Sequence, residues 1–181
     1  EGLLREVRAR VARGDGFTEP GAVRLFWVNP VADLRVMNRM EDGGFRLCGT
    51  DFMFGHALDE IPGDLPPVEA LARMALADPM IGPASDRADR IVRDARAGGA
   101  EVLVISRIPG ASHCATEGAV IAARVRDTLD IPALEIEVPS VSDPLRGALQ
   151  TRLGALAEIA RARRDAGDKR GAMERWSCGV V

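Results

Sequence analysis

The sequence predicts an α/β fold built on a four-stranded parallel sheet, with helices on both faces and a long C-terminal helix. Two observations support this prediction. Short runs rich in β-branched and apolar residues have the length and composition of buried strands, and they cover 23–28, 45–51, 102–105 and 131–139. Segments with apolar residues at helical spacing separate these runs. Strands that alternate with helices need right-handed crossovers, which produce a doubly wound sheet.

The segments between the strands carry helix signals. The expected helices cover 32–44, 68–78, 84–99, the segment from the loop at 112–114 to about Leu129, and a final helix that starts at Ser142, Asp143 and Pro144. We expect Ser85 to cap the start of its helix. The segment 52–68 is rich in Gly and Pro, so we expect a long functional loop or lid there. The complete pattern is that of a small flavodoxin-like domain.

The chain divides into three parts by pattern. Residues 1–16 are expected to form a linker helix that packs on the domain or arrives from a preceding one, because Leu4, Val7 and Val11 follow helical spacing. Residues 17–165 form the flavodoxin-like α/β domain, and residues 166–181 a C-terminal tail. The first residue is Glu1, not Met, so we expect a processed or truncated chain.

Composition excludes several classes of function. The chain of 181 residues has a net charge of −3, so it lacks the basic field that nucleic acid or anionic lipid requires. It contains neither a signal-peptide segment nor an apolar run long enough to span a bilayer, and we expect a cytoplasmic protein. The three cysteines are odd in number and widely separated, which argues against a disulfide framework, and a self-contained metal site of the CxxC type is absent. Motifs for mononucleotide, dinucleotide, serine-hydrolase and zincin chemistry are absent.

The loop after the third strand is the candidate site. It presents Ser112, His113 and Cys114 where the next helix begins, at the sheet edge where open α/β folds bind ligands. A helix N-terminus favours a thiolate at Cys114, whereas the alternative is a buried and inert thiol. A catalytic pair with Cys114 would need His56 from the long loop. Asp51, at the end of the second strand, either faces the same crevice or caps a turn.

Several stretches resemble one family, the 2-hydroxyacyl-CoA dehydratase and benzoyl-CoA reductase subunits. The similar pieces are GGFRLCGTDFMFG, DRADRIVRDARAGGAEVLVIS, GASHCAT, LDIPALEIEVP and LQTRLGALAEI. The resemblance extends over nearly all of residues 1–164. Relatives often carry a cysteine where this chain has Met53 and a basic residue where it has Ala115. These two departures are what a divergent branch would show, or a partner subunit whose cluster only relays electrons.

The resemblance implies a subunit of two stacked flavodoxin-like domains that hold a [4Fe-4S] cluster with cysteines from both. Cys114 carries over as the metal ligand, with Ser112, His113 and Asp51 beside the cofactor, and the other ligands would come from an upstream domain outside this chain. The implied partners are an acyl-CoA substrate, a homologous partner subunit, and an ATP-dependent activator protein that supplies a low-potential electron. The 52–62 loop would line the pocket for the acyl-CoA. The acyl-CoA would then undergo dehydration or aromatic ring reduction. The alternative is a flavodoxin-like scaffold or subunit interface without a cluster.

Overall fold

The computed structural model describes residues 1–16, 19–30, 33–52, 60–78, 81–111, 116–139 and 146–177, with backbone alone at 146 and 168–177. Its centre is a sheet of four parallel strands in the order β2-β1-β3-β4. The strands are β1 (Val23–Val28), β2 (Phe45–Asp51), β3 (Val102–Arg107) and β4 (Ala133–Glu137). This arrangement confirms the predicted doubly wound, flavodoxin-like sheet.

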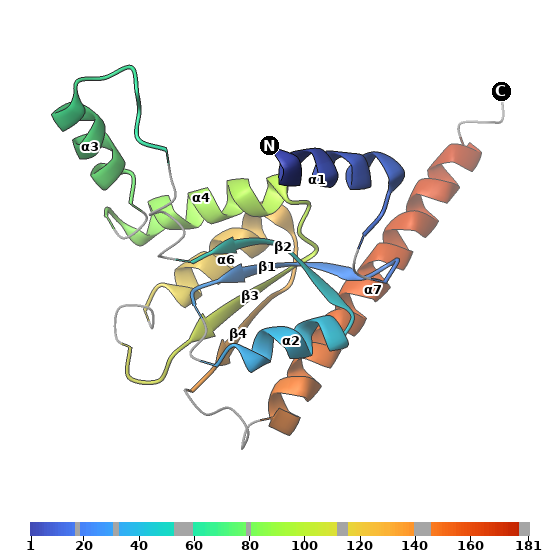
Figure 1. Cartoon of the computed structure of the whole chain (residues 1–181). Helices are drawn as coiled ribbons and strands as arrows, with labels where there is room; N and C mark the ends of the chain where they lie inside the picture. The colour runs from blue at the N-terminus through green and yellow to red at the C-terminus, as the bar shows by residue number, and fades with distance from the viewer. Residues whose placement is uncertain are drawn as a thin grey trace.

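Helices cover both faces of the sheet (Figure 1). The helices α2 (Arg35–Asp42) and α7 (Arg146–Ser177) pack on one face, and α4 (Ala84–Ala97) and α6 (Gly118–Leu129) on the other. Strand β1 shows why, because successive side chains of a strand point to opposite faces. Leu25 and Trp27 join the core under α2 and α7, whereas Phe26 and Val28 join the core under α4 and α6.

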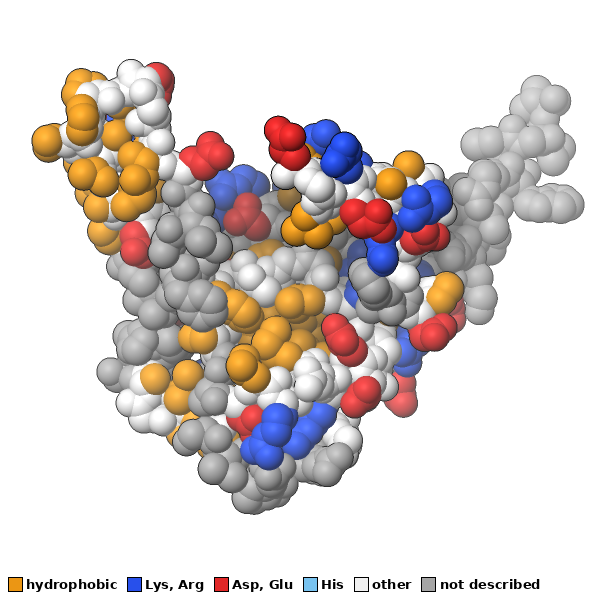
Figure 2. Space-filling view, viewed as in Figure 1, with side chains coloured by type: hydrophobic (Ala, Val, Ile, Leu, Met, Phe, Trp, Pro, Cys, Tyr) orange, Lys and Arg blue, Asp and Glu red, His pale blue; other side chains and the backbone are white. Residues whose placement is uncertain are grey.

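Two further helices contribute little to the core. Helix α1 (Gly2–Arg13) contains no buried residue, and α3 (Pro67–Leu76) buries only Ala70. Figure 2 shows hydrophobic side chains gathered on the surface of α3, where Val68, Leu71 and Leu76 are exposed. Within the part of the chain that the structure describes, no helix is both long and apolar enough to cross a bilayer.

The helix ends differ from the sequence predictions at two places. Helix α4 begins at Ala84 after Pro83, so Ser85 lies inside the first turn and does not cap it. The Ser85 hydroxyl instead lies 3.3 Å from the Asp86 carboxylate. At the other end of the chain, α7 continues to Ser177, past the change of composition at Arg164. A long helix tolerates that change because its far end projects beyond the sheet and needs no apolar face there (Figure 1).

The strand order places a topological switch point between β1 and β3. From β1 the chain goes to β2 on one side, and from β3 it goes to β4 on the other. The loops that leave these two strands therefore diverge at the carboxyl edge of the sheet, where a crevice is expected in this class of fold. Residues 108–117 connect β3 to α6, and of these the structure describes 108–111, 116 and 117.

Candidate functional site

A buried polar network lies at the carboxyl edge of the sheet. Asn29 follows β1, Asp51 ends β2, and Ser106 lies one residue before the end of β3. All three are at most 5% exposed. Asn29 has a positive φ of 66°, a conformation that asparagine tolerates better than most residues. Each of these three strands thus has a buried polar side chain at or next to its carboxyl end.

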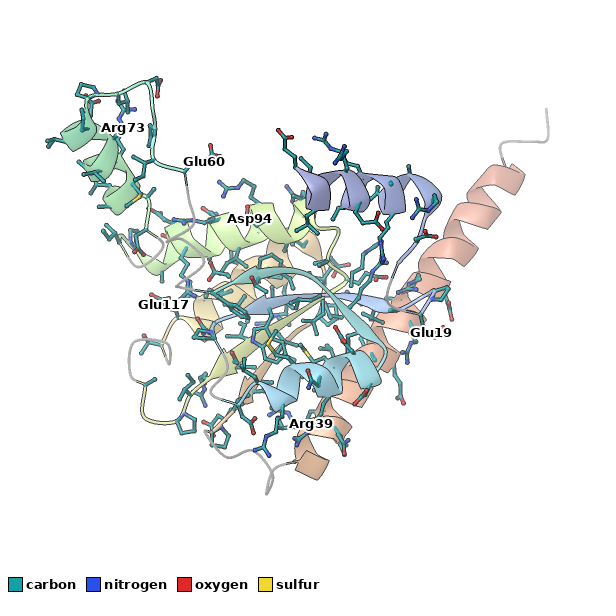
Figure 3. The ribbon with its side chains drawn as sticks, in the orientation of Figure 1. Glu19, Arg39, Glu60, Arg73, Asp94 and Glu117 are labelled. Carbon is teal, nitrogen blue, oxygen red and sulfur yellow. The ribbon has the colours of Figure 1, made fainter. Side chains whose placement is uncertain are left out.

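Arg87 of α4 joins these strand ends to α6. Its Nε and Nη2 donate hydrogen bonds to Oδ2 of Asp51 at 3.0 and 2.6 Å, and Nη2 also donates to Oδ1 of Asn29 at 2.7 Å. Its Nη1 donates to Oε2 of Glu117 at 2.6 Å. Glu117 immediately precedes α6, beside the start of α4 (Figure 3). A single guanidinium therefore connects β1, β2, α4 and the beginning of α6.

Ser106 extends the network beneath β1. Its Oγ accepts a hydrogen bond of 3.0 Å from the indole nitrogen of Trp27 and lies within 3.2 Å of the carbonyl oxygens of Val28, Asn29 and Pro30. The side-chain amide nitrogen of Asn29, Nδ2, donates a hydrogen bond to the backbone carbonyl oxygen of Ser106 at 3.0 Å. These contacts hold the carboxyl ends of β1 and β3 together at the switch point, because each polar atom has a partner in a fixed position.

Among the described members of the network, acids outnumber bases, because Asp51 and Glu117 share Arg87. Burial alone lowers the pKa of the Arg87 guanidinium, but the charge and hydrogen bonds of Asp51 together with those of Glu117 more than compensate, so its pKa is raised. Arg87 is only 2% exposed and stays positively charged. With both carboxylates ionised, the three side chains carry one net negative charge, and the partly exposed Glu117 brings that charge toward the surface.

The predicted site residues fall into two groups. Asp51 lies at the carboxyl edge, as expected, with its side chain bound to Arg87. Ser112, His113 and Cys114 lie outside the described residues, as does His56 of the long loop. The described chain stops at Ala111 and resumes at Thr116, and Glu117 is the described residue of this segment that binds Arg87.

Sequence reasoning missed four members of the network, namely Asn29, Arg87, Ser106 and Glu117, and one of them had a visible signal. Arg87 is four residues before Ile91, so it lies on the inward face of α4 with the apolar residues. A charged residue on that face needs a buried partner. Asn29, Ser106 and Glu117 had no comparable signal, because their partners come from distant parts of the chain.

The described cysteine is not placed to bind metal. Cys48 lies half-buried within β2, packed against the core under α4 and α6. Burial raises the pKa of its thiol, which opposes the thiolate form that metals bind. Within residues 1–177 outside the gaps, no group of three or more His, Cys, Asp or Glu side chains is arranged to hold a metal ion. The described residues therefore do not provide the ligand set of an iron–sulfur cluster.

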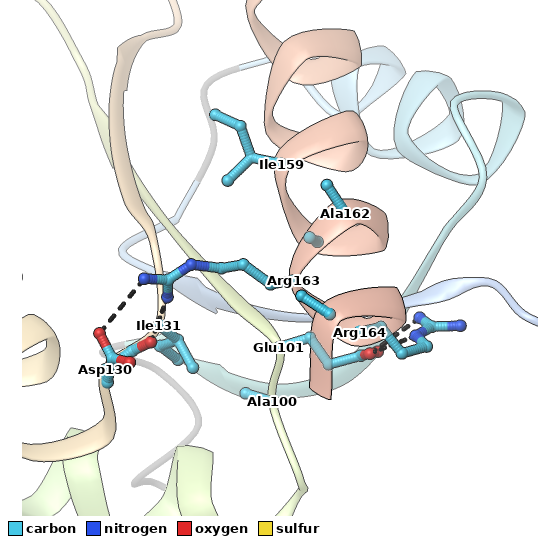
Figure 4. A pocket seen from close by; sticks show the side chains of 10 residues that line it. Ala100, Glu101, Asp130, Ile131, Ile159, Ala162, Arg163 and Arg164 are labelled. Atoms are coloured by element: carbon cyan, nitrogen blue, oxygen red, sulfur yellow. Dashed lines mark hydrogen bonds and ion pairs between the residues drawn. The ribbon is translucent and has the colours of Figure 1, made fainter. Parts of the chain in front are cut away.

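A separate cleft of about 580 Å³ opens at the opposite edge of the sheet. Figure 4 shows its charged side chains paired with each other. Arg163 contacts the carbonyl and carboxylate oxygens of Asp130, and Arg164 binds Glu101 at 2.8 Å. Because these groups already have partners and the amino ends of parallel strands rarely bind ligands, this cleft is a weaker candidate.

Comparison with known proteins points to one family. A family model described as "2-hydroxyglutaryl-CoA dehydratase, D-component" matches residues 1–160. No curated protein matches the chain. The matched range includes the whole sheet and the complete Arg87 network.

Proposed function

The chain belongs to the 2-hydroxyglutaryl-CoA dehydratase D-component family, and we propose that it is the C-terminal domain of an iron–sulfur subunit of a 2-hydroxyacyl-CoA dehydratase or a related aryl-CoA reductase. The observation that supports this proposal most is the Arg87 network. It fixes the carboxyl edge at the switch point, which is where a fold of this class binds its ligand.

Cys114 is the proposed cluster ligand of this chain. It stands in the sequence three residues before Glu117, whose carboxylate the network anchors. One thiolate cannot hold a [4Fe-4S] cluster, so the other ligands would come from cysteines outside this chain. A cluster held there would supply the low-potential electron that acyl-CoA dehydration or ring reduction needs.

The remaining site residues have supporting roles in this proposal. Ser112 and His113 shape the surroundings of the cluster. Asp51 acts indirectly, because it accepts two hydrogen bonds from Arg87 and so fixes that side chain. Hydrogen bonds near a thiolate ligand tune the reduction potential of a cluster, which gives these neighbours a chemical purpose. The net negative charge of the Asp51, Arg87 and Glu117 group favours the oxidised, less negative state of a nearby redox centre.

The proposed partners follow from the family. A protein described as one component of a dehydratase works with further components, and we infer a homologous partner subunit, an acyl-CoA substrate and an ATP-dependent activator protein. The proposed location is the cytoplasm. Whether the reaction is a dehydration by a lyase or a reduction by an oxidoreductase depends on the partner and the acyl group.

Iron content tests the proposal directly. The full-length gene product is purified without oxygen together with its partner subunit, and iron, acid-labile sulfide and the absorbance near 400 nm that thiolate-bound clusters give are measured. We expect Cys114→Ala to abolish the cluster. Cys48→Ala is the matched control and should leave it intact, because Cys48 is a core residue of β2. A wild-type complex without metal would favour a cluster-free scaffold instead. An iron content that Cys114→Ala leaves unchanged would favour it too.

A further inference from the structure

Two acid–arginine pairs join α4 to α6, and they differ in their surroundings. Arg87 binds Glu117 at the carboxyl edge, and Asp89 binds Arg124 at 2.5 Å further along α6. The side chains of Asp89 and Arg124 are each 52% exposed, whereas Arg87 is 1% and Glu117 22% exposed. Exposed pairs contribute little to stability, so the second pair is a surface contact between the same two helices.

The buried pair is also attached to the sheet. Besides Glu117, Arg87 binds Asp51 at the end of β2 and Asn29 after β1. A guanidinium is planar and its donors point in fixed directions, so its bonds to β1 and β2 determine where the remaining donor points. The Glu117 carboxylate is therefore held at a defined position relative to two strands as well as to α4.

Neutralising a buried charge does not require this arrangement. Asp51 alone balances the charge of Arg87 and binds it through two nitrogen atoms. Glu117 adds a second carboxylate and leaves an excess negative charge. Its distinctive effect is geometric, because it fastens the residue at which the loop from β3 ends and α6 begins.

We propose that Arg87 is a positioning residue, which fixes the Glu117 end of the loop between β3 and α6 against the carboxyl ends of β1 and β2. This role adds to the proposed function. It rests on that function only for the identity of the group that the loop presents, which is Cys114. Arg87 itself need not touch a substrate or a cofactor in this role.

Hydrogen–deuterium exchange of the full chain tests the positioning. Glu117→Gln keeps the shape of the side chain, removes its charge, and leaves the bonds of Arg87 to Asp51 and Asn29 in place. We expect exchange of amides in 108–121 to become about tenfold faster, with little change in the melting temperature. Asp89→Asn is the matched control, because it removes an acid from the other pair between the same helices. It should leave exchange in 108–121 within about twofold of the wild type.

Either of two results overturns the positioning role. If Glu117→Gln leaves exchange in 108–121 unchanged, the end of the loop does not depend on the pair of Arg87 and Glu117. An equal effect of Asp89→Asn would show that the pair only joins two helices. Arg87→Lys offers a further check, since lysine keeps the charge but cannot reach several acceptors in fixed directions. We expect this variant to lose much of the protection as well.

A second measurement links the positioning to the cofactor. In the anaerobic complex with its partner subunit, Glu117→Gln should shift the reduction potential and the electron paramagnetic resonance signal of the cluster, whereas Asp89→Asn should not. An unchanged signal together with faster exchange would overturn the link to the cofactor. A wild-type complex without iron would reject the proposed function, while the exchange measurement would still decide the role of Arg87.

Discussion

Arg87 is a charged residue that the protein encloses almost completely. Its side chain is 1% exposed and has acceptors from three other elements of the fold. A buried ion pair is a weak source of stability compared with apolar packing, but removing one partner leaves an uncompensated charge inside the protein. The residue therefore has more value as an organiser of the carboxyl edge than as a contributor to net stability.

Truncation of Arg87 should be costly, and a second change should relieve it. We expect Arg87→Met to lower the free energy of unfolding by about 3–5 kcal/mol, because Asp51, at 5% exposed, loses its two bonds to Arg87. Combining it with Asp51→Asn should recover part of the loss. Urea unfolding followed by circular dichroism measures both. Arg124→Met, at an exposed arginine, is the control and should leave the stability nearly unchanged.

Cys48 predicts a dependence of stability on pH. Burial raises the pKa of the Cys48 thiol above its ordinary value of 9.0. The unfolded chain then loses this proton at a lower pH than the folded chain does. The contribution of Cys48 to stability is therefore fully present below pH 9.0 and is lost as the pH rises through the raised pKa.

The measurement compares the wild type with Cys48→Ala. We expect the wild type to lose stability relative to Cys48→Ala as the pH rises above 9.0, and the two proteins to keep a constant difference in unfolding free energy below it. The chain has no tyrosine, which removes one group that would otherwise titrate in this range. A difference that stays constant over the range would contradict the burial of the thiol.

At the scale of elements, the contact between the end of α4 and β2 is close. The pairing of β1 with β2 shifts between Leu25 and Phe26, so that Cys48 is an extra residue in β2. A Cβ atom on Gly98, just after α4, would lie 2.8 Å from the Cys48 carbonyl oxygen. That oxygen belongs to the backbone of a paired strand and cannot move aside cheaply.

Two glycine-to-alanine substitutions should therefore have opposite effects. We expect Gly98→Ala to destabilise the protein by about 1–3 kcal/mol, because it forces α4 and β2 apart. Gly154→Ala lies within α7, where an added Cβ meets nothing within 4 Å, so it should stabilise the protein by up to about 1 kcal/mol. Thermal unfolding of both variants checks this. Equal effects of the two would mean that helix propensity, and not the contact with β2, decides the outcome.

At the scale of the whole molecule, the folded body is the sheet with α2, α7, α4 and α6. Both core clusters draw their residues from these elements and from the strands and short segments between them. Helix α1 stands outside this body, and its apolar side chains are largely exposed, with Leu3 at 78% and Val11 at 76%. Because no residue of α1 is buried, the helix should contribute little to the stability of the domain.

Removal of α1 should consequently leave the domain intact. A chain that starts at Asp15 should melt within about 2 °C of the full chain, because none of the deleted residues is buried. It should also be more soluble, since four exposed apolar side chains are lost, namely Leu3, Leu4, Val7 and Val11. Differential scanning calorimetry gives the first comparison. A large fall in the melting temperature would mean that α1 packs on the domain in solution.

The sequence by itself determined the architecture. Buried strands that are apolar on both faces, such as Val23–Val28, and helices with one apolar face, such as Ala84–Ala97, need each other to bury their surfaces. The order in which they alternate then leaves few topologies, and the observed sheet is the expected one. The sequence signals for where a helix starts were less dependable. Serine is a residue type that often caps helices, but the first turn of α4 begins at Ala84, before Ser85.

Only the tertiary structure decided which polar side chains meet. Asn29, Asp51 and Glu117 are separated from Arg87 by 58, 36 and 30 residues. Spacing along the chain says nothing about contacts over such separations, because they depend on the strand order and on the direction from which α4 and α6 cross the sheet. The sequence could place an acid at the end of β2. Only the packing of α4 and α6 on one face of the sheet brings Asp51 and Glu117 to the same arginine, Arg87.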